Sequence, residues 1–236
     1  MKIESKLSHR LKMIASFLTA KTCFADIGSD HGYLPCYVCL HDPFAQAIAG
    51  EVREGPYRRA IETVQQYDLA KRIEVRLGNG LDVIQDNDHI NEIVVAGMGG
   101  SLISKILANG SKKLNHVNRL ILQPNNHAHL VRQWLFHNGY SLVNEVIMEE
   151  NDHIYEIIIG EKKSETLYQE TMLIEKQFMF GPILINEKTP VFLKKWEHER
   201  IKLLHVIRQM KHAKNMDEEK LTLYETQLRW IEEVLS

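Results

Sequence analysis

Acidic residues and glycines alternate in the stretch CFADIGSDHGYLP near the N-terminus, where Asp26, Gly28, Asp30, His31 and Gly32 fall within seven positions. Glycine lets a ligand approach the main chain closely. The two carboxylates would attract a cation, whereas a pyrophosphate prefers bare amides at the start of a helix. The glycine order also differs from the G-x-G-x-x-G of dinucleotide sites. The stretch therefore predicts a site for a positively charged ligand, with His31 either contacting it or ordering the turn.

The order Asp26-x-Gly28-x-x-x-Gly32 resembles the first motif of S-adenosylmethionine-dependent methyltransferases, in which an acidic residue precedes G-x-G-x-G. Asp30 replaces the middle glycine of that motif. The sulfonium and α-ammonium groups of this cofactor are cations that the carboxylates would attract. The motif therefore favours a methyl-donor site over a nicotinamide site.

Two later stretches suggest contacts to a nucleoside. Glu51 lies 19 residues beyond Gly32, where a carboxylate can accept hydrogen bonds from both ribose hydroxyls. A solvent-facing glutamate at a strand end is the alternative. Asn79 and Gly80 in GNGLD can meet the edge of an adenine, although Asn79 can equally shape a turn.

Two further stretches suit a flat base. The three glycines of AGMGG, which include Gly97, leave room for a ring, or else relieve crowding between a helix and a strand. Gln123, Asn125 and Asn126 in QPNNH have side chains that can pair with the N6/N7 edge of an adenine. An Asn-rich turn after proline is the alternative for these residues.

Short apolar runs precede all five stretches and alternate with helical patterns. Strands are predicted at 23–28, 46–52, 72–78, 92–98 and 119–125, and helices at roughly 55–68, 101–108 and 127–138. Strands that are apolar on both faces and separated by helices indicate a parallel sheet covered on both sides. The polar stretches would then lie together at the carboxyl edge of that sheet, where such folds bind ligands.

The pattern changes on either side of this parallel region. Leu7, Leu11, Ile14 and Leu18 predict an amphipathic first helix. After residue 139, two β-rich runs flank the turn pair Asn151-Asp152 and predict an antiparallel hairpin. The fold class is therefore α/β, a seven-stranded, doubly wound Rossmann-like sheet of five parallel strands and a C-terminal hairpin.

The tail predicts two antiparallel helices joined by an apolar seam, after a mixed connector that begins at residue 163. The seam residues are Phe192, Trp196, Leu203, Val206, Met210 and Ala213 on the first helix, and Leu221, Tyr224, Leu228, Ile231 and Leu235 on the second. The segment KNMDEE lies between them, and its acids suit a helix start. We therefore predict a cofactor-binding domain over residues 1–162 and a helical coiled-coil domain over residues 163–236.

Charge is distributed unevenly along this tail. Residues 186–214 hold eight Lys or Arg against three Glu, whereas residues 215–236 hold two against six acids. The first helix could bind phosphates while the second supports it. An ordinary pair of oppositely charged helices is the alternative.

Composition sets the remaining limits. The 236 residues are 44% hydrophobic and 25% charged with a net charge of −2, so a polyanion-binding surface must be local. Residues 1–20 lack the apolar core of a secretory leader, and no long apolar run suggests a membrane span. Cys36 and Cys39 show a zinc-like spacing, but a second ligand pair is missing, so we expect buried thiols and no metal. We expect a cytoplasmic protein.

The motifs together resemble one family. DIGSDHGYLP, AGEV, GNGLD, AGMGG, LILQPN, GPILINEKTPVFLKKW and the helical tail are similar to those of the TrmK-type bacterial tRNA (adenine-22-N1)-methyltransferases, from about Leu7 to the C-terminus. The resemblance implies a class I methyltransferase domain with a coiled-coil domain, and methyl transfer from S-adenosylmethionine to N1 of an adenine in the D-arm of tRNA. It also leads us to expect an acid where Asn79 stands.

These inferences give a set of predicted site residues. Cofactor contacts are predicted at Asp26, Ile27, Gly28, Ser29, His31, Gly32, Glu51, Val52, Asn79, Gly80, Ala96, Gly97 and Met98. Catalytic positions are predicted at Asp30, Gln123, Asn125 and Asn126. Contacts to RNA are predicted at Arg10, Arg58, Arg59, Lys194, Lys195, Arg200, Lys202 and Arg208.

The predicted reaction needs positioning more than acid or base strength, because the methyl group of a sulfonium is already activated. Asp30 can accept a proton from the exocyclic amine after transfer, or only cap the next helix or hold the cofactor. A paired adenine must leave its stem before N1 is accessible. We expect a monomer. The alternative functions are methylation of another RNA site or of a small molecule, and RNA binding with a vestigial cofactor site.

Overall fold

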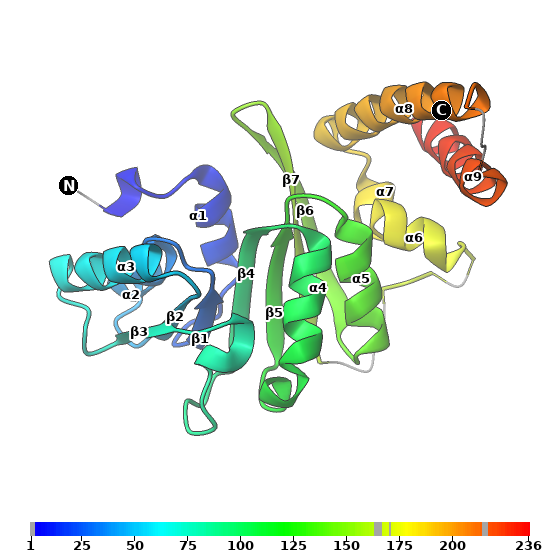
Figure 1. Ribbon diagram of the computed structural model, residues 1–236. Coiled ribbons are helices and arrows are strands. Elements are labelled where there is room, and N and C mark those ends of the chain that lie inside the picture. Colours follow the sequence, from blue (N-terminus) through cyan, green and yellow to red (C-terminus); the bar gives the residue numbers. More distant parts are fainter. Residues whose placement is uncertain (1–2, 163–166, 170, 214–216) are drawn as a thin grey trace. The chain divides into compact units, whose positions relative to one another are not determined.

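The computed structural model describes residues 3–162, 167–169, 171–213 and 217–236 (Figure 1). The chain divides into two compact units, residues 1–167 and residues 168–236. The domain boundary predicted between residues 162 and 163 falls beside residues 163–166, which lie outside the described residues. Each unit buries apolar side chains of its own.

The strands of the first unit form one mixed sheet. In the described part of the chain it has seven strands in the order β3-β2-β1-β4-β5-β7-β6. Their bounds are β1 Cys23–Ile27, β2 Gln46–Glu51, β3 Ile73–Leu77, β4 Glu92–Met98, β5 Arg119–Pro124, β6 Ser141–Glu150 and β7 His153–Glu161. The first five are parallel, and β7 is antiparallel to β5 and β6, which confirms the predicted sheet. The strand order reverses between β1 and β4, so a ligand is expected beyond their carboxyl ends.

Helices cover both faces of this sheet (Figure 1). The helices α1 His9–Ser16, α2 Tyr33–His41 and α3 Glu54–Gln66 pack on one face, around a core that includes Ile14, Phe24 and Ile121. The helices α4 Gly100–Asn109 and α5 Ala128–His137 pack together against β4 and β5. Short 3-10 helices are η1 Ile3–Ser5, η2 Gly80–Val83 and η3 Ser111–Leu114. Covering both faces explains why the parallel strands are apolar along their length.

The hairpin of β6 and β7 is fixed at its turn and at the middle of its strands. Asn151 and Asp152 both have positive φ, 51° and 61°, as a two-residue hairpin turn with the twist of the strands requires. At the middle of the strands, the buried Arg132 of α5 bonds Glu145 at 2.5 Å and Glu156 at 2.6 Å. This cluster ties α5 to the hairpin, and removing one partner would leave a charge buried without compensation.

The second unit is helical. Its helices are α6 Ile174–Phe180, α7 Leu184–Glu187, α8 Pro190–Lys211 and α9 Glu218–Leu235. The side chains of Thr189 and Asp217 cap the first turns of α8 and α9. The rings of Phe192 and Trp196 on α8 cluster with that of Phe180 at the end of α6, and the ring centres of Phe180 and Trp196 are 4.4 Å apart.

The seam between α8 and α9 departs from the predicted heptad. Phe192, Trp196 and Ile231 are buried as predicted, but Val206 is exposed and Ile207 is buried in its place. Ile207 lies 11 residues after Trp196, which is three turns of an uncoiled helix. The heptad prediction, with its shorter repeat, placed the seam residue at Val206 instead. The Lys211 Nζ to Glu225 Oε1 ion pair, at 2.6 Å, links the two helices. No helix among the described residues has the length and apolar character needed to cross a bilayer.

Candidate active site

The turn after β1 keeps the backbone of the glycine motif. The amides of Gly28 and Ser29 donate to the Gly50 carbonyl at 2.9 and 3.1 Å, which ties the turn to β2. Gly28, Asp30 and Gly32 all have positive φ, 73°, 54° and 70°. Aspartate tolerates this left-handed region better than most side chains. Asp30 therefore replaces the middle glycine of the motif without changing the course of the turn.

Two buried carboxylates lie on either side of this turn. Asp26 is 4% exposed and accepts a hydrogen bond from the Ser29 hydroxyl at 2.6 Å. Burial raises the pKa of Asp26 to about 7, and the nearby Glu51 adds to the rise. Glu51 is 6% exposed, and burial also raises its pKa although it accepts the Asp30 amide. Neither carboxylate pairs with a Lys or Arg within the described ranges.

A cationic ligand with adjacent hydroxyl groups would offset this cost. Two acids buried together without a cation destabilise one another, because burial and like charge both oppose ionisation. A ligand ammonium or sulfonium supplies the missing charge, and ribose hydroxyls can donate to Glu51. The chemistry of the donor set therefore fits S-adenosylmethionine.

The ends of β2 and β3 add an apolar rim and a cavity. Val52 and Leu77 are 62% and 49% exposed, and Leu77 is paired with Glu51 across the two strands. A cavity of about 210 Å³ is lined by Asn79 and Gly80 and by residues of η2 and α4, and neither Val52 nor Leu77 is among its lining residues. These positions suit an adenine ring, with Val52 against its face and Asn79 at its edge.

At the end of β4, few described side chains cover the main chain at Gly97. Gly97 has φ +77° in a bulge between Ala96 and Met98, and within the described chain the nearest atom to its missing Cβ is Arg10 Nη1, 3.8 Å away. Met98 projects toward the first turn, where its Cε would collide with a Cβ at Gly28. The Gly97 peptide therefore offers a flat surface near the turn after β1, and the Met98 side chain lies against Gly28 of that turn.

Gln123 and Asn125 hold this open peptide in place. The Oε1 of Gln123 accepts the Gly97 amide at 3.0 Å, and its Nε2 donates to Asn125 Oδ1 at 3.0 Å. Asn125 Nδ2 donates in turn to the Gly97 carbonyl at 2.8 Å. Gln123 is fully buried, so its position favours loop structure over base pairing, whereas Asn125 and Asn126 are exposed.

Arg10 joins the same network from α1. Its Nη1 donates to Gln123 Oε1, and its guanidinium lies 4.9 Å from the centre of the Tyr155 ring. The Glu150 carboxylate accepts the amides of His9 at 2.5 Å and Arg10 at 3.4 Å, which holds the start of α1 to the hairpin. The sequence predicts Arg10 as a phosphate contact but contains no signal for its contacts with Gln123 and Tyr155.

Comparison with known proteins decides the family. A family model described as TrmK, tRNA (adenine(22)-N(1))-methyltransferase, matches residues 24–233. The chain belongs to this family. The tRNA (adenine(22)-N(1))-methyltransferase of Bacillus subtilis strain 168 is 40% identical over 222 residues, which are 94% of this chain and 93% of that protein. The TrmK reaction, methylation of N1 of adenine 22 in tRNA, is therefore the reaction of this chain.

Solved TrmK structures share the whole fold. The Bacillus subtilis M1A22 tRNA methyltransferase TrmK superposes with a TM-score of 0.90 at 37% identity, covering 98% of this chain and 99% of that one. Streptococcus pneumoniae Sp1610, a structure in complex with S-adenosyl-L-methionine, gives 0.86 at 39%, covering 98% and 100%. Mycoplasma capricolum TrmK, in complex with S-adenosyl-homocysteine, gives 0.84 at 26%, covering 97% of each chain. The chain is thus a class I methyltransferase that uses S-adenosylmethionine.

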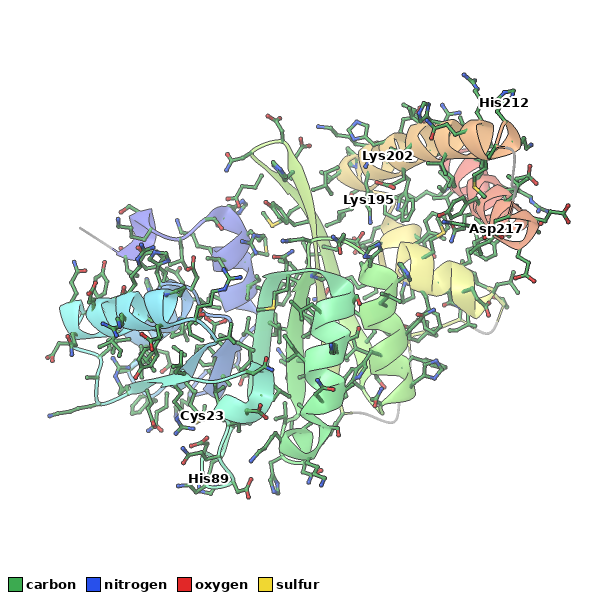
Figure 2. All side chains as sticks on the ribbon, in the orientation of Figure 1. Cys23, His89, Lys195, Lys202, His212 and Asp217 are labelled. Carbon is green, nitrogen blue, oxygen red and sulfur yellow. The ribbon has the colours of Figure 1, made fainter. Side chains whose placement is uncertain are left out.

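The cations predicted to contact RNA in this TrmK chain differ in their surroundings. On α3, Arg58 pairs with Glu54 at 3.0 Å, whereas Arg59 Nη1 lies 3.2 Å from His31 Nε2. On α8, Arg200 and Lys202 pair with Glu197 and Glu199 at 2.7 and 2.8 Å. Lys195, which Figure 2 labels on α8 together with Lys202, lies over the Trp196 ring at 4.6 Å. Lys194 and Arg208 are exposed. Same-helix acids therefore reduce the positive field of α8 at two of its predicted contacts.

The cysteines are part of the core. Cys36 and Cys39 are fully buried on α2, and burial raises their pKa values to about 12 and about 11. In the residues that the structure describes, no three His, Cys, Asp or Glu side chains gather as metal ligands. The Cys36 and Cys39 spacing therefore reflects one buried face of a helix.

Proposed function

We propose that the carboxyl edge of β1, β2, β4 and β5 is the active site, with an acidic half for S-adenosylmethionine and an amide half for adenine 22. The observation that supports this proposal is the pair of buried carboxylates, Asp26 and Glu51, beside the open peptide of Gly97. The first half binds a cation, and the second accepts a flat ring within reach of it.

In the acidic half, each residue has a separate task. S-adenosylmethionine, when bound, supplies a methyl group activated on a positive sulfur. Asp26 attracts the ligand's positive charge, Glu51 accepts the ribose hydroxyls, and Val52 packs on the adenine ring. The side-chain carbonyl of Asn79 accepts the amino group of that ring, which an acid does in the pattern expected of the family. Gly28 and Gly32 keep side chains away from the ligand.

In the amide half, the residues receive a base turned out of its stem. The nucleotide must leave its pair because N1 is otherwise hidden, at a cost of a few kcal/mol that contacts to the RNA offset. Asn125 and Asn126, both exposed, recognise the N6/N7 edge. Gln123 and Arg10 position them through the Gly97 peptide. Asp30, on the rim, faces the exocyclic amine and accepts its proton.

We assign RNA binding to α8 together with α3. Lys194, Lys195 and Arg208 on α8 offer positive charge to phosphates, and α9 packs against that helix and supports it. We expect the enzyme to act as a cytoplasmic monomer on folded tRNA. Light scattering of the purified chain, alone and with tRNA, tests the stoichiometry.

Incubation with labelled S-adenosylmethionine and unmodified tRNA transcripts tests the function. We expect 1-methyladenine at position 22, and no label in a transcript that carries guanine there or in reactions with the Asp26→Ala variant. Methylation at another atom or position would contradict the proposal, as would consumption of the cofactor without RNA.

A further inference from the structure

Three side chains form a line from α3 to the rim of the active site. Arg59 Nη1 lies 3.2 Å from His31 Nε2, and His31 Nδ1 lies 2.9 Å from Asp30 Oδ1. Arg59 and Asp30 are exposed, with the Asp30 side chain 71% accessible, whereas His31 is only 28% accessible. The line therefore connects Arg59 on α3 to the exposed carboxylate of Asp30 in the turn after β1.

The chemistry of the end groups determines where the histidine carries its proton. A guanidinium has only donors, so Nε2 of His31 must accept from Arg59. In the neutral ring the proton is then on Nδ1, which donates it to Asp30. The Tyr33 ring stacks on His31 at 5.3 Å and 12° and limits its rotation. Arg59 thus selects the tautomer that binds the carboxylate.

Asp30 is held at both its main chain and its side chain. Its amide donates to Glu51, and its φ of 54° fixes the direction of the Cβ bond. His31 occupies Oδ1, which leaves Oδ2 for another donor. Asp30 therefore contacts Glu51 through its backbone amide and presents one side-chain oxygen at the rim of the site.

We propose that Arg59 and His31 are positioning residues, which aim Oδ2 of Asp30 at the exocyclic amine of the target adenine. This inference rests on the proposed function. As N1 bonds the methyl carbon, the electron pair of the broken C–S bond stays on sulfur, and the adenine becomes a cation. The carboxylate stabilises that charge and accepts a proton from N6, which leaves neutral 1-methyladenine; Asp30 then releases the proton to water. Arg59 therefore affects kcat and does not bind a phosphate of the RNA.

Variants of His31 test the tautomer directly. Asparagine places an amide near the Nδ1 position, whereas glutamine places it near Nε2. We expect His31→Asn to keep most of the kcat for tRNA methylation, and His31→Gln to lose about tenfold, a modest part of what a general base contributes. Equal losses in the two variants would overturn the inference.

Variants of Arg59 separate positioning from RNA binding. We expect Arg59→Ala to lower kcat about tenfold, with the KM for tRNA and the Kd for S-adenosylmethionine within about twofold, and Arg59→Lys to recover part of the loss. Lys71→Ala, which removes an exposed cation from the turn between α3 and β3, is the control for lost charge. Thermal unfolding checks that each variant is folded.

The two hypotheses fail in different ways. A raised KM for tRNA with an unchanged kcat in Arg59→Ala would make Arg59 a phosphate contact and overturn the inference alone. So would a weaker Kd for S-adenosylmethionine in His31→Gln, because His31 would then be a cofactor contact. Absence of 1-methyladenine with the unmodified enzyme would overturn the proposed function, and the inference with it.

Discussion

The two halves of the active-site edge use different polar groups. At the ends of β1 and β2 these groups are the carboxylates of Asp26 and Glu51, buried close together. At the ends of β4 and β5 they are the neutral amides of Gln123 and Asn125, bonded to the Gly97 peptide. The difference matches the charges of the two ligands in the proposed function, a cation on one side and a neutral base on the other.

The halves also differ in how complete they are without a ligand. The amides of β4 and β5 satisfy one another, so that half is built before the base arrives. The carboxylates are buried at a cost that the hydrogen bonds from Ser29 and from the Asp30 amide offset only in part. The acidic half is thus shaped for binding at the expense of stability, and changes to the two halves should have different effects.

The largest effect is expected at Asp26. Asp26→Asn removes the negative charge and keeps the shape, so the Kd for S-adenosylmethionine should rise about 100-fold, as for the loss of a charged hydrogen bond of nearly 3 kcal/mol. Calorimetry measures this. Asp152→Asn, at the hairpin turn, is the charge-matched control and should bind normally. A change below about threefold at Asp26 would remove the basis for the comparison.

The same substitution should stabilise the unliganded protein. The raised pKa of Asp26 means that the folded state holds its proton more tightly than the unfolded state. Stability from this group is present at low pH and is lost as pH rises through about 7. At pH 8, Asp26→Asn should therefore raise the free energy of unfolding by on the order of 2 kcal/mol, and by little at pH 4. Urea unfolding at both values tests the sign.

Gln123 should behave in the opposite way. Gln123→Ala leaves the Gly97 amide and Arg10 without their acceptor, so kcat should fall by about 10- to 100-fold as the base site loosens. The Kd for S-adenosylmethionine should stay within about twofold. Gln123→Glu keeps an acceptor and should lose less. If cofactor binding fell as much as turnover, the two halves would not be separable.

Cofactor affinity should depend on pH through Asp26. The ligand binds the ionised carboxylate, whose pKa in the free protein is about 7, so affinity should fall about tenfold between pH 8 and pH 6. The raised pKa of Glu51 acts in the same direction. Asp26→Asn should lose most of this dependence. A flat profile for the unmodified protein would place both acids at ordinary pKa values.

The smallest effect is expected on α8. Lys202 is exposed and already paired with Glu199, so Lys202→Ala should raise the KM for tRNA only about threefold. Glu199→Gln frees the same lysine and should lower the KM, more so at low salt. Equal and unchanged KM values in both variants would remove α8 from the proposed RNA surface.

Local patterns predicted the sheet and the position of the acidic half of the candidate site on it. Asp26, Gly28 and Glu51 lie at or just beyond the carboxyl ends of β1 and β2, so their place at one edge comes from the order of the elements. Even Asp30, which departs from the glycine motif, lies where the motif requires because aspartate accepts a positive φ. The hairpin turn at Asn151 and Asp152 was equally local.

Contacts between distant segments were not predictable in this way. Arg10 reaches Gln123 across 113 positions, and no spacing rule connects the two. The burial of Gln123 depends on the bulge at Gly97, which sequence patterns do not show. Val206 was wrongly assigned to the seam. The predicted heptad and the observed uncoiled helix differ by only one position at this distance from Trp196, and Glu199 interrupts the apolar stripe between the two.

The buried sulfurs of α2 have a practical consequence. The thiolate is the form that alkylating and oxidising reagents attack, and the Cys36 and Cys39 pKa values of about 12 and 11 keep both residues protonated at neutral pH. Burial raises the pKa of Cys23 as well, but this thiol is partly accessible at the start of β1, so covalent reagents would reach it first. A probe attached to Cys23 would lie at the amino end of β1, at the edge of the sheet opposite the candidate active site.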